Sequence, residues 1–320
     1  MTRSRVLILL AFAAVYLIWG STYLAIRYAI ETLPPFLMAA TRFLTAGAIL
    51  FTWAAINGEN IRASISQWPR AFILGALLLL CGNGGVTWAE KYIASGLAAL
   101  LVATEPLLVV MLNWAISHRR PNAKVLFGVL IGLVGVALLV GDGLRRVEAG
   151  SLMSLLGSGV VILSSLAWAA GSVYSNRRPI KASTSMASGM QMLAGGSLLL
   201  LLGLGAGDFQ RLNLANASGV SLVAFAYLTV FGSLIAFTAY SYLLRNVTPA
   251  RAATYAYVNP VVAVLLGWLI AGEPIHLRML VAAVIIVGSV ALITTFGKEH
   301  TTVYIAPPLH DSDSPTHPCA

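Results

Sequence analysis

The chain has 320 residues, of which 58% are hydrophobic and only 10% are charged. A soluble domain carries roughly 25% charged residues, so this composition excludes an ordinary water-soluble domain and favours a membrane protein. The formal net charge of +9 does not indicate nucleic-acid binding, because the cations are dispersed between apolar stretches rather than gathered into a basic patch. We therefore expect the lipid bilayer, and no nucleic acid, around the chain.

Ten apolar stretches follow one another along the sequence, and each is long enough to cross a bilayer core of about 30 Å as a helix. Their apolar residues lie all round rather than alternating, which excludes the strands of a membrane barrel. We predict an all-α integral membrane protein with ten transmembrane helices. The predicted ranges are 6–27, 36–56, 70–90, 94–116, 123–141, 151–174, 184–206, 218–243, 249–271 and 276–296.

The two ends of the chain need separate interpretation. The first stretch follows Arg3 and Arg5 and superficially resembles a signal peptide. It is too long for a signal-peptide core and no convincing cleavage site follows it, so we interpret it as the first span. At the other end, residues 297–320 are polar and contain several prolines, and we predict a disordered cytoplasmic tail.

The distribution of lysine and arginine predicts the orientation. If the N-terminus lies in the cytoplasm, the inner segments carry 13 of these cations and the outer segments carry 6, with one more inside a span. Cytoplasmic loops of membrane proteins carry the excess of positive charge. We therefore predict that both termini are cytoplasmic.

The two halves of the sequence align when the chain is shifted by 154 residues. AALLVATEPLLVVMLNW (98–114) falls on AATYAYVNPVVAVLLGW (252–268), and GVALL (135–139) falls on SVALI (289–293). We predict two five-helix repeats, in residues 1–145 and 146–296. An odd number of spans reverses the orientation of the second copy, and such inverted repeats are an architecture of secondary transporters.

Several motifs resemble the EamA family of the drug/metabolite transporter superfamily. They are WGSTY in the first span, ATRFLTAGAIL in the second, and AYSYLLRNVTPARAATYAYVNPVVAVLLGWLIAGEP at 239–274. GNGGVTWAEKYIASGLAALLVATEP is similar to one branch of bacterial permeases. The resemblance implies a secondary carrier in the inner membrane, usually an exporter of amino acids or amphipathic metabolites, with a central cavity between its halves.

Two prolines occupy matching positions in the predicted repeats, Pro106 in the fourth span and Pro260 in the ninth. A proline inside a helix frees the carbonyl group one turn back, here that of Val102 or Ala256. In a membrane such a carbonyl needs a neighbouring donor or a water-filled cavity. Interrupted helices at matching positions mark the binding site of many carriers. We predict that Pro106 and Pro260 are hinges of moving helices.

Glu105 directly precedes the first of these prolines, roughly 15 Å below the outer surface at 1.5 Å per residue. A charge at such a depth costs about 2.5–3.5 kcal/mol, so an ionisable residue there indicates a functional site. We predict that Glu105 faces a wet cavity and binds a proton or a cationic group of a small-molecule substrate. The alternative is a structural ion pair with Arg42 in the second span.

Polar and aromatic residues at helical spacing complete the predicted site. Asn259 is the repeat mate of Glu105, and Tyr255 lies one turn away on the same face. Aromatic rings can stack on a flat or cationic group. The alternatives are interhelical hydrogen bonds and interfacial anchoring. The predicted substrate-binding residues are Glu105, Asn259, Tyr255, Asn83, Thr87, Trp19, Tyr23 and Trp168.

Glu90 and Lys91 lie close to the predicted outer end of the third span. Long charged side chains reach water from such positions at little cost. We interpret both residues as interfacial rather than functional.

Other classes of protein fit the sequence less well. A membrane-embedded enzyme needs a catalytic cluster, but the five histidines all lie in predicted loops or in the tail, and no phosphate-binding Gly–Lys loop is present. A channel usually carries repeated filter motifs or charge rings, and none is visible. The two cysteines, Cys81 and Cys319, indicate neither a disulfide framework nor a metal site. We expect no enzyme, metal or cofactor, and a channel-like facilitator is the alternative.

Overall fold

The computed structural model describes residues 3–118, 120–145, 152–271 and 277–297. Over these ranges the chain forms helices and no β-strand. The prediction of an all-α membrane protein is confirmed. The predicted tail lies outside the described residues except for Gly297, and the predicted boundary between the repeats falls at the edge of the undescribed segment 146–151.

Helices occupy the first five predicted ranges. The third is one continuous helical stretch whose middle part is π-helical, and the fourth is broken into two helices. A short helix, α3 (Ile61–Ile65), precedes the third stretch. The main elements are α1 (Arg3–Ala29), α2 (Pro35–Ile56), α4 (Trp68–Leu74), η1 (Gly75–Gly84), α5 (Gly85–Ala89), α6 (Ser95–Val102), α7 (Glu105–Ser117) and α8 (Ala123–Arg145).

The second half follows the same order. The eighth predicted range again contains a π-helical part, and the ninth is again broken. Two short elements, α11 (Asp208–Arg211) and η2 (Leu214–Asn216), lie in the loop before the eighth range. The main elements are α9 (Leu152–Arg177), α10 (Thr184–Gly205), α12 (Gly219–Tyr227), η3 (Leu228–Phe237), α13 (Thr238–Asn246), α14 (Pro249–Ala252), α15 (Tyr255–Ala271) and α16 (Leu277–Phe296).

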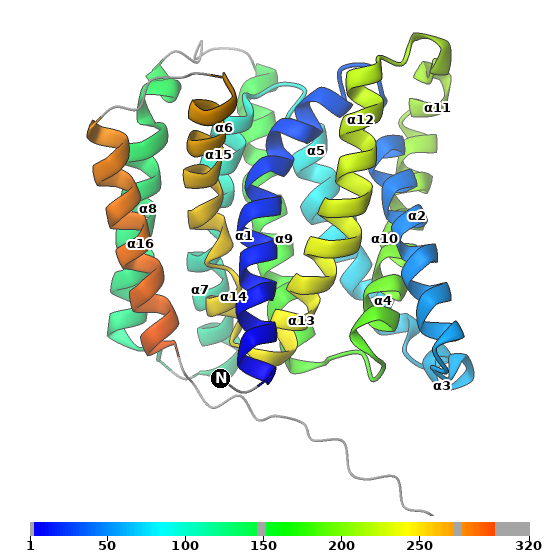
Figure 1. Ribbon diagram of the computed structural model, residues 1–320, viewed down its shortest axis with the longest axis horizontal. Helices are drawn as coiled ribbons and strands as arrows, with labels where there is room; N and C mark the ends of the chain where they lie inside the picture. The colour runs from blue at the N-terminus through cyan, green and yellow to red at the C-terminus, as the bar shows by residue number, and fades with distance from the viewer. Residues whose placement is uncertain (1–2, 119, 146–151, 272–276, 298–320) are drawn as a thin grey trace, which may run out of the picture.

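Among the described residues, eight helical stretches are long and apolar enough to cross a membrane, and 123–139 forms a shorter apolar helix. The total of ten crossings and the inversion of the repeats remain predictions. Figure 1 shows that α1 begins and α16 ends at the same edge of the bundle. This arrangement requires an even number of crossings.

Large apolar side chains cover the outside of the bundle, as a helix surrounded by lipid requires. Leu10 on α1, Leu155 on α9 and Val284 on α16 are all more than half exposed. At one end of the bundle α8 packs against α16, and at the other end α2 packs against α10 (Figure 1). The helices that carry the predicted site lie between these two pairs.

Small residues allow close contact between helices in the half of the bundle built on α10. A Cβ atom added at Gly189 of α10 would lie 2.8 Å from the main-chain nitrogen of Phe51 in α2. One added at Gly75 of η1 would lie 2.5 Å from the main-chain nitrogen of Gly195 in α10. Backbones approach this closely in membranes because packing, rather than a hydrophobic driving force, holds the helices together.

The fourth and ninth predicted spans are each broken by two residues in a tight turn. In the first half Thr104 N bonds to Leu101 O at 3.1 Å, and in the second half Thr254 N bonds to Arg251 O at 3.3 Å. In each break the threonine hydroxyl also donates to that carbonyl, at 2.7 Å in both. Each break therefore satisfies one carbonyl, that of Leu101 or Arg251, within its own turn.

The structure corrects the predicted position of the prolines. Pro106 lies in the first turn of α7 rather than inside a helix. A proline there removes no hydrogen bond, because the first amide groups of a helix have no intrahelical partner. Pro260 lies inside α15, several residues after the break. The two prolines match in sequence, but the second break occurs about one helical turn earlier relative to its proline.

The predicted orientation can be tested by cysteine labelling. After both native cysteines are replaced by serine, we expect Asn57→Cys to be protected in intact cells, because it follows the end of α2 at the edge where α1 begins and α16 ends. We expect Gln210→Cys on α11 to react with an impermeant maleimide, because α11 lies at the opposite edge in Figure 1. The reverse labelling pattern would contradict the prediction that the termini are cytoplasmic.

The contact at Gly75 provides a test of the packing. Gly75→Ala should lower the melting temperature in detergent, because overpacking costs about 1–3 kcal/mol and only main-chain atoms surround the site. Gly159→Ala on α9 is the matched control, since nothing lies within 4 Å of its added Cβ. Equal melting temperatures for the two variants would disprove the close contact.

Candidate functional site

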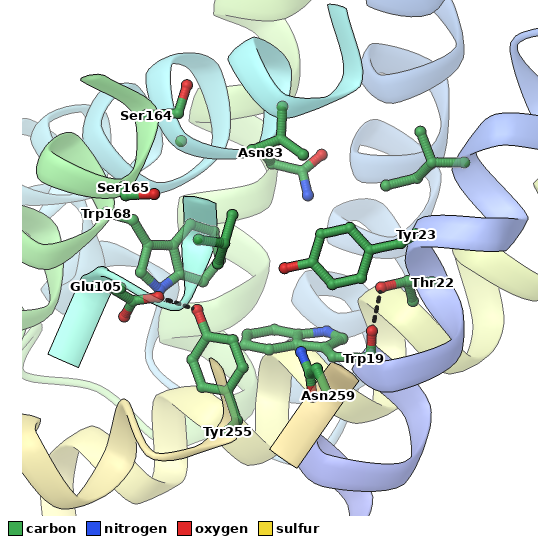
Figure 2. A pocket seen from close by; sticks show the side chains of 14 residues that line it. Trp19, Thr22, Tyr23, Asn83, Glu105, Ser164, Ser165, Trp168, Tyr255 and Asn259 are labelled. Atoms are coloured by element: carbon green, nitrogen blue, oxygen red, sulfur yellow. Dashed lines mark hydrogen bonds between the residues drawn. The ribbon is translucent and has the colours of Figure 1, made fainter. Parts of the chain in front are cut away.

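A cavity of about 70 Å³ lies in the middle of the bundle (Figure 2). This volume accommodates several water molecules, because one water needs about 10–15 Å³ by the same kind of measure. Both halves of the chain contribute to its wall. The lining residues are Trp19, Thr22, Tyr23, Ile26, Gly82, Asn83, Val86, Val102, Glu105, Ser164, Ser165, Trp168, Tyr255 and Asn259.

Glu105 places a carboxyl group in this wall, and its side chain is 1% exposed. It is the first residue of α7, directly after the break. The first turn of a helix presents amide groups without intrahelical partners and a partial positive charge of about half an elementary charge. An acidic residue followed by proline is typical of such a start. The Glu–Pro pair therefore begins a helix, and the helix end favours the carboxylate.

Tyr255 is the first residue of α15, the corresponding helix of the second half. Its hydroxyl donates a hydrogen bond to Glu105 Oε2 (Figure 2). The other carboxyl oxygen, Glu105 Oε1, has no hydrogen-bond partner among the described residues. One bond thus joins the starts of the two broken helices, and one oxygen stays free to bind a proton or a cation.

Aromatic rings from several helices surround this bond. The ring centroid of Trp19 lies 4.8 Å from that of Tyr255 and 5.5 Å from that of Trp168. Tyr240 of α13 supports the group from outside the lining, with its ring 5.1 Å from Trp19. Its hydroxyl accepts a hydrogen bond from Trp168 Nε1 at 3.1 Å and lies 2.7 Å from Ser172 Oγ. These rings can stack on an apolar or cationic group.

The two tryptophans occupy related positions in the two halves. Trp19 of α1 donates a hydrogen bond to the carbonyl of Gly232 in η3 at 3.2 Å. Trp168 of α9 lies against Gly82 in η1, where an added Cβ would be 2.8 Å from the indole ring. Each indole therefore packs on a glycine in the π-helix of the opposite half.

The polar wall opposite the aromatic rings comes from η1. Asn83 accepts a hydrogen bond from Arg42 Nη2 at 2.6 Å. Thr87 donates to the carbonyl of Asn83 at 2.8 Å and is buried without lining the cavity. Asn259 lines the cavity beside Tyr23, and its amide interacts with the Tyr23 hydroxyl without the geometry of a hydrogen bond.

The structure does not contain the ion pair proposed as an alternative for Glu105. No contact of ion-pair length joins Arg42 to Glu105, and both residues belong to the described part of the chain. Arg42 instead binds Asn83, and its electrostatic neighbour is Glu90. The reason is packing, because α2 lies against α10, η1 and α5 rather than against α7.

The sequence-level interpretation of Glu90 is also wrong. Lys91 is exposed, but Glu90 is completely buried. The prediction treated the end of the third helix as a membrane surface, whereas Glu90 is buried there, with Arg27 bonded to its main-chain carbonyl and both Arg27 and Arg42 acting on its charge.

Seven of the eight predicted substrate-binding residues line the cavity, and Thr87 lies directly behind Asn83. Their role in binding remains a prediction. Sequence reasoning missed Thr22, Ser164, Ser165 and the supporting Tyr240. Ser164 could have been found, because it lies one turn before Trp168 on the same face of α9. No comparable sequence pattern in the helix of Tyr240 indicated that this residue lies beside the cavity.

The fold is that of a helical membrane protein with a cavity lined by both halves of the chain. A model of the EamA-like transporter family matches residues 6–141 and again residues 155–295. The chain therefore belongs to the EamA-like transporter family.

Similar proteins come from distant organisms. The uncharacterized inner membrane transporter YedA of Escherichia coli K12 is 39% identical over 308 residues, covering 95% of this chain and 96% of the relative. The uncharacterized transporter YvbV of Bacillus subtilis 168 is 23% identical, with coverages of 95% and 96%. A protein of known crystal structure matches with a TM-score of 0.74 at 22% identity, over 92% of this chain and 99% of that chain, and shows the same fold.

The different positions of the prolines lead to a test. Pro260→Ala should restore a helical hydrogen bond to the carbonyl of Ala256 and remove a cost of about 3 kcal/mol. We expect slower hydrogen–deuterium exchange in α15. Pro106→Ala is the matched control and should leave exchange in α7 nearly unchanged. If Pro260→Ala and Pro106→Ala change hydrogen–deuterium exchange in their helices equally, the different positions of the two prolines have no effect on helix flexibility.

Proposed function

We propose that this membrane transporter is a secondary carrier that exports a small metabolite by alternating access. In this proposal the repeats 1–145 and 146–296 are inverted and move against each other, with both termini in the cytoplasm. The observation that carries the proposal is the hydrogen bond between Glu105 and Tyr255 inside an aromatic enclosure. It connects broken helices from both halves, and broken helices at a repeat interface are where carriers bind their substrates.

The chemistry of the cavity supports a class of substrate. One carboxyl oxygen of Glu105 is free to accept a bond from a cationic group. The rings of Trp19, Trp168 and Tyr255 offer faces for an apolar or aromatic body. An amphipathic metabolite, an amino acid or a drug-like compound with an amino group fits this combination. A metabolite is larger than several waters, so the cavity must widen on one side to admit it.

Glu105 also supports a means of coupling. A carboxyl group that binds either a proton or a cationic substrate group, but not both, exchanges one for the other. An inward proton gradient then drives export, and one proton crossing a potential of 100 mV contributes about 2.3 kcal/mol. Tyr255 would hold the carboxyl group in place during this exchange.

The test compares cells that overproduce the protein with cells that overproduce Glu105→Gln. Metabolite profiling of the medium should show at least one amino-bearing compound that accumulates only with the unmodified protein. In proteoliposomes, the pH gradient should drive transport of that compound, and Glu105→Gln should reduce the rate about tenfold or more. The expected loss follows from removal of a charged partner worth about 1.5–3 kcal/mol.

Two further variants sharpen this test. Glu31→Gln removes an exposed carboxyl group outside the cavity and should transport normally. Tyr255→Phe removes only the hydroxyl that binds Glu105 and should slow transport less than Glu105→Gln does. Full gradient-driven transport by a well-folded Glu105→Gln protein would overturn the proposal. Transport that neither saturates nor responds to counterflow would instead favour a channel-like facilitator.

A further inference from the structure

A second buried carboxyl group lies outside the cavity. Glu90 directly follows the last residue of α5 and is completely buried. Neither of its carboxyl oxygens has a hydrogen-bond partner among the described residues. A buried polar group without a partner costs about 1–3 kcal/mol, and more if it is charged. Such a group in a folded protein requires an explanation.

The neighbouring cations approach Glu90 without binding its carboxyl group. Arg27 of α1 donates to the main-chain carbonyl of Glu90 at 2.7 Å. Arg42 of α2 donates to Asn83, and its Nε has no partner. Both arginines nevertheless act electrostatically on Glu90. The carboxyl group is therefore influenced by two positive charges but held by neither.

Other titratable groups lie on the side of the cavity. The hydroxyl of Tyr23 on α1 interacts with Glu90 and also with Glu105. From α9, which packs against α5, the segment 152–168 contributes no titratable side chain. Lys91 is next in sequence but is exposed. Tyr23 is thus connected electrostatically to two buried carboxyl groups, one that lines the cavity and one that does not.

Asn83 provides a second connection between Glu90 and the cavity. It lines the cavity and accepts the hydrogen bond from Arg42. It also lies two turns before Glu90 on the same face of one continuous helical stretch, with Thr87 between them. A change in charge at Glu90 would therefore act on Arg42 and, through it, on the polar wall of the cavity.

We propose that Glu90 is a second proton-binding site, which exchanges protons with the membrane surface at the end of α5. When Glu90 is ionised, its negative charge offsets part of the repulsion between Arg27 and Arg42. A bound proton removes that charge, and the repulsion between the two arginines then loosens the contact of α2 with α5 and the hydrogen bond from Arg27 to the Glu90 carbonyl. The proposal goes beyond the proposed function, because proton binding at Glu90 requires no substrate and no transport.

The experiment is infrared difference spectroscopy of the reconstituted full-length protein during a pH titration. It follows the carbonyl stretch of protonated carboxylic acid groups. We expect the unmodified protein to show a band that Glu90→Gln abolishes and Glu105→Gln retains. Glu31→Gln, which changes an exposed carboxyl group, should retain it as well. If a folded Glu90→Gln protein keeps every band, Glu90 does not exchange protons and is only a fixed counter-ion.

A second variant keeps the test decisive if Glu90→Gln does not fold. Arg27 is exposed, so Arg27→Gln removes a cation near Glu90, together with the hydrogen bond to the Glu90 main-chain carbonyl, with little change in the buried side-chain packing. Loss of a neighbouring cation disfavours the ionised carboxylate. The midpoint of the band should therefore move to higher pH in Arg27→Gln, and an unchanged midpoint would overturn the proposal. This experiment measures no transport, so its result does not depend on whether Glu105→Gln reduces transport.

Discussion

A carboxyl group in the middle of an apolar helix bundle must be supported by donors, and this constraint shapes the centre of the molecule. Glu105 obtains support from two sources, the hydrogen bond from the hydroxyl of Tyr255 and the partial positive charge at the start of α7. Both depend on broken helices, since α7 and α15 begin inside the bundle only because the chain turns at Ala103–Thr104 and Ala253–Thr254. The threonine hydroxyls help to stabilise these breaks in a membrane, because each donates a hydrogen bond to one carbonyl at its turn.

The aromatic residues connect the hydrogen-bonded pair of Glu105 and Tyr255 to other helices of the bundle. Trp19 packs on Tyr255 and hydrogen-bonds to Gly232 in the opposite half. Trp168 packs on Trp19 and on Gly82. Each half therefore supplies one indole ring that contacts the other half. A rearrangement of one half therefore directly affects the cavity-lining residues of the other half. A binding site shared by two halves requires this property.

Much of this could be predicted from the sequence, because a bilayer allows few solutions. Apolar stretches of sufficient length must be helices, and the described helices coincide with the predicted ranges. Asn259 could be identified as the repeat mate of Glu105, and Tyr255 could be placed on the same helix face as Asn259, one turn away. The partners of Arg42 and Glu90 could not be predicted, because they depend on which helices pack together. The depth of Glu90 along its helix suggested contact with water, and only the position of α1 and α2 shows that it is covered.

The π-helical segments η1 and η3 have a consequence for how side chains can move. A π-helix bonds each residue to the fifth along the chain rather than the fourth, so its turns hold more residues than α-helical turns. In an α-helix each residue adds about 100° of rotation and 1.5 Å of rise. Rewinding one turn from π to α geometry would therefore turn the following helix about its own axis while lengthening it only slightly. In η1 such a twist would carry the side chains of Asn83 and of Val86 in α5 around the helix axis along the cavity wall, with the helix ends left almost in place at the two membrane surfaces.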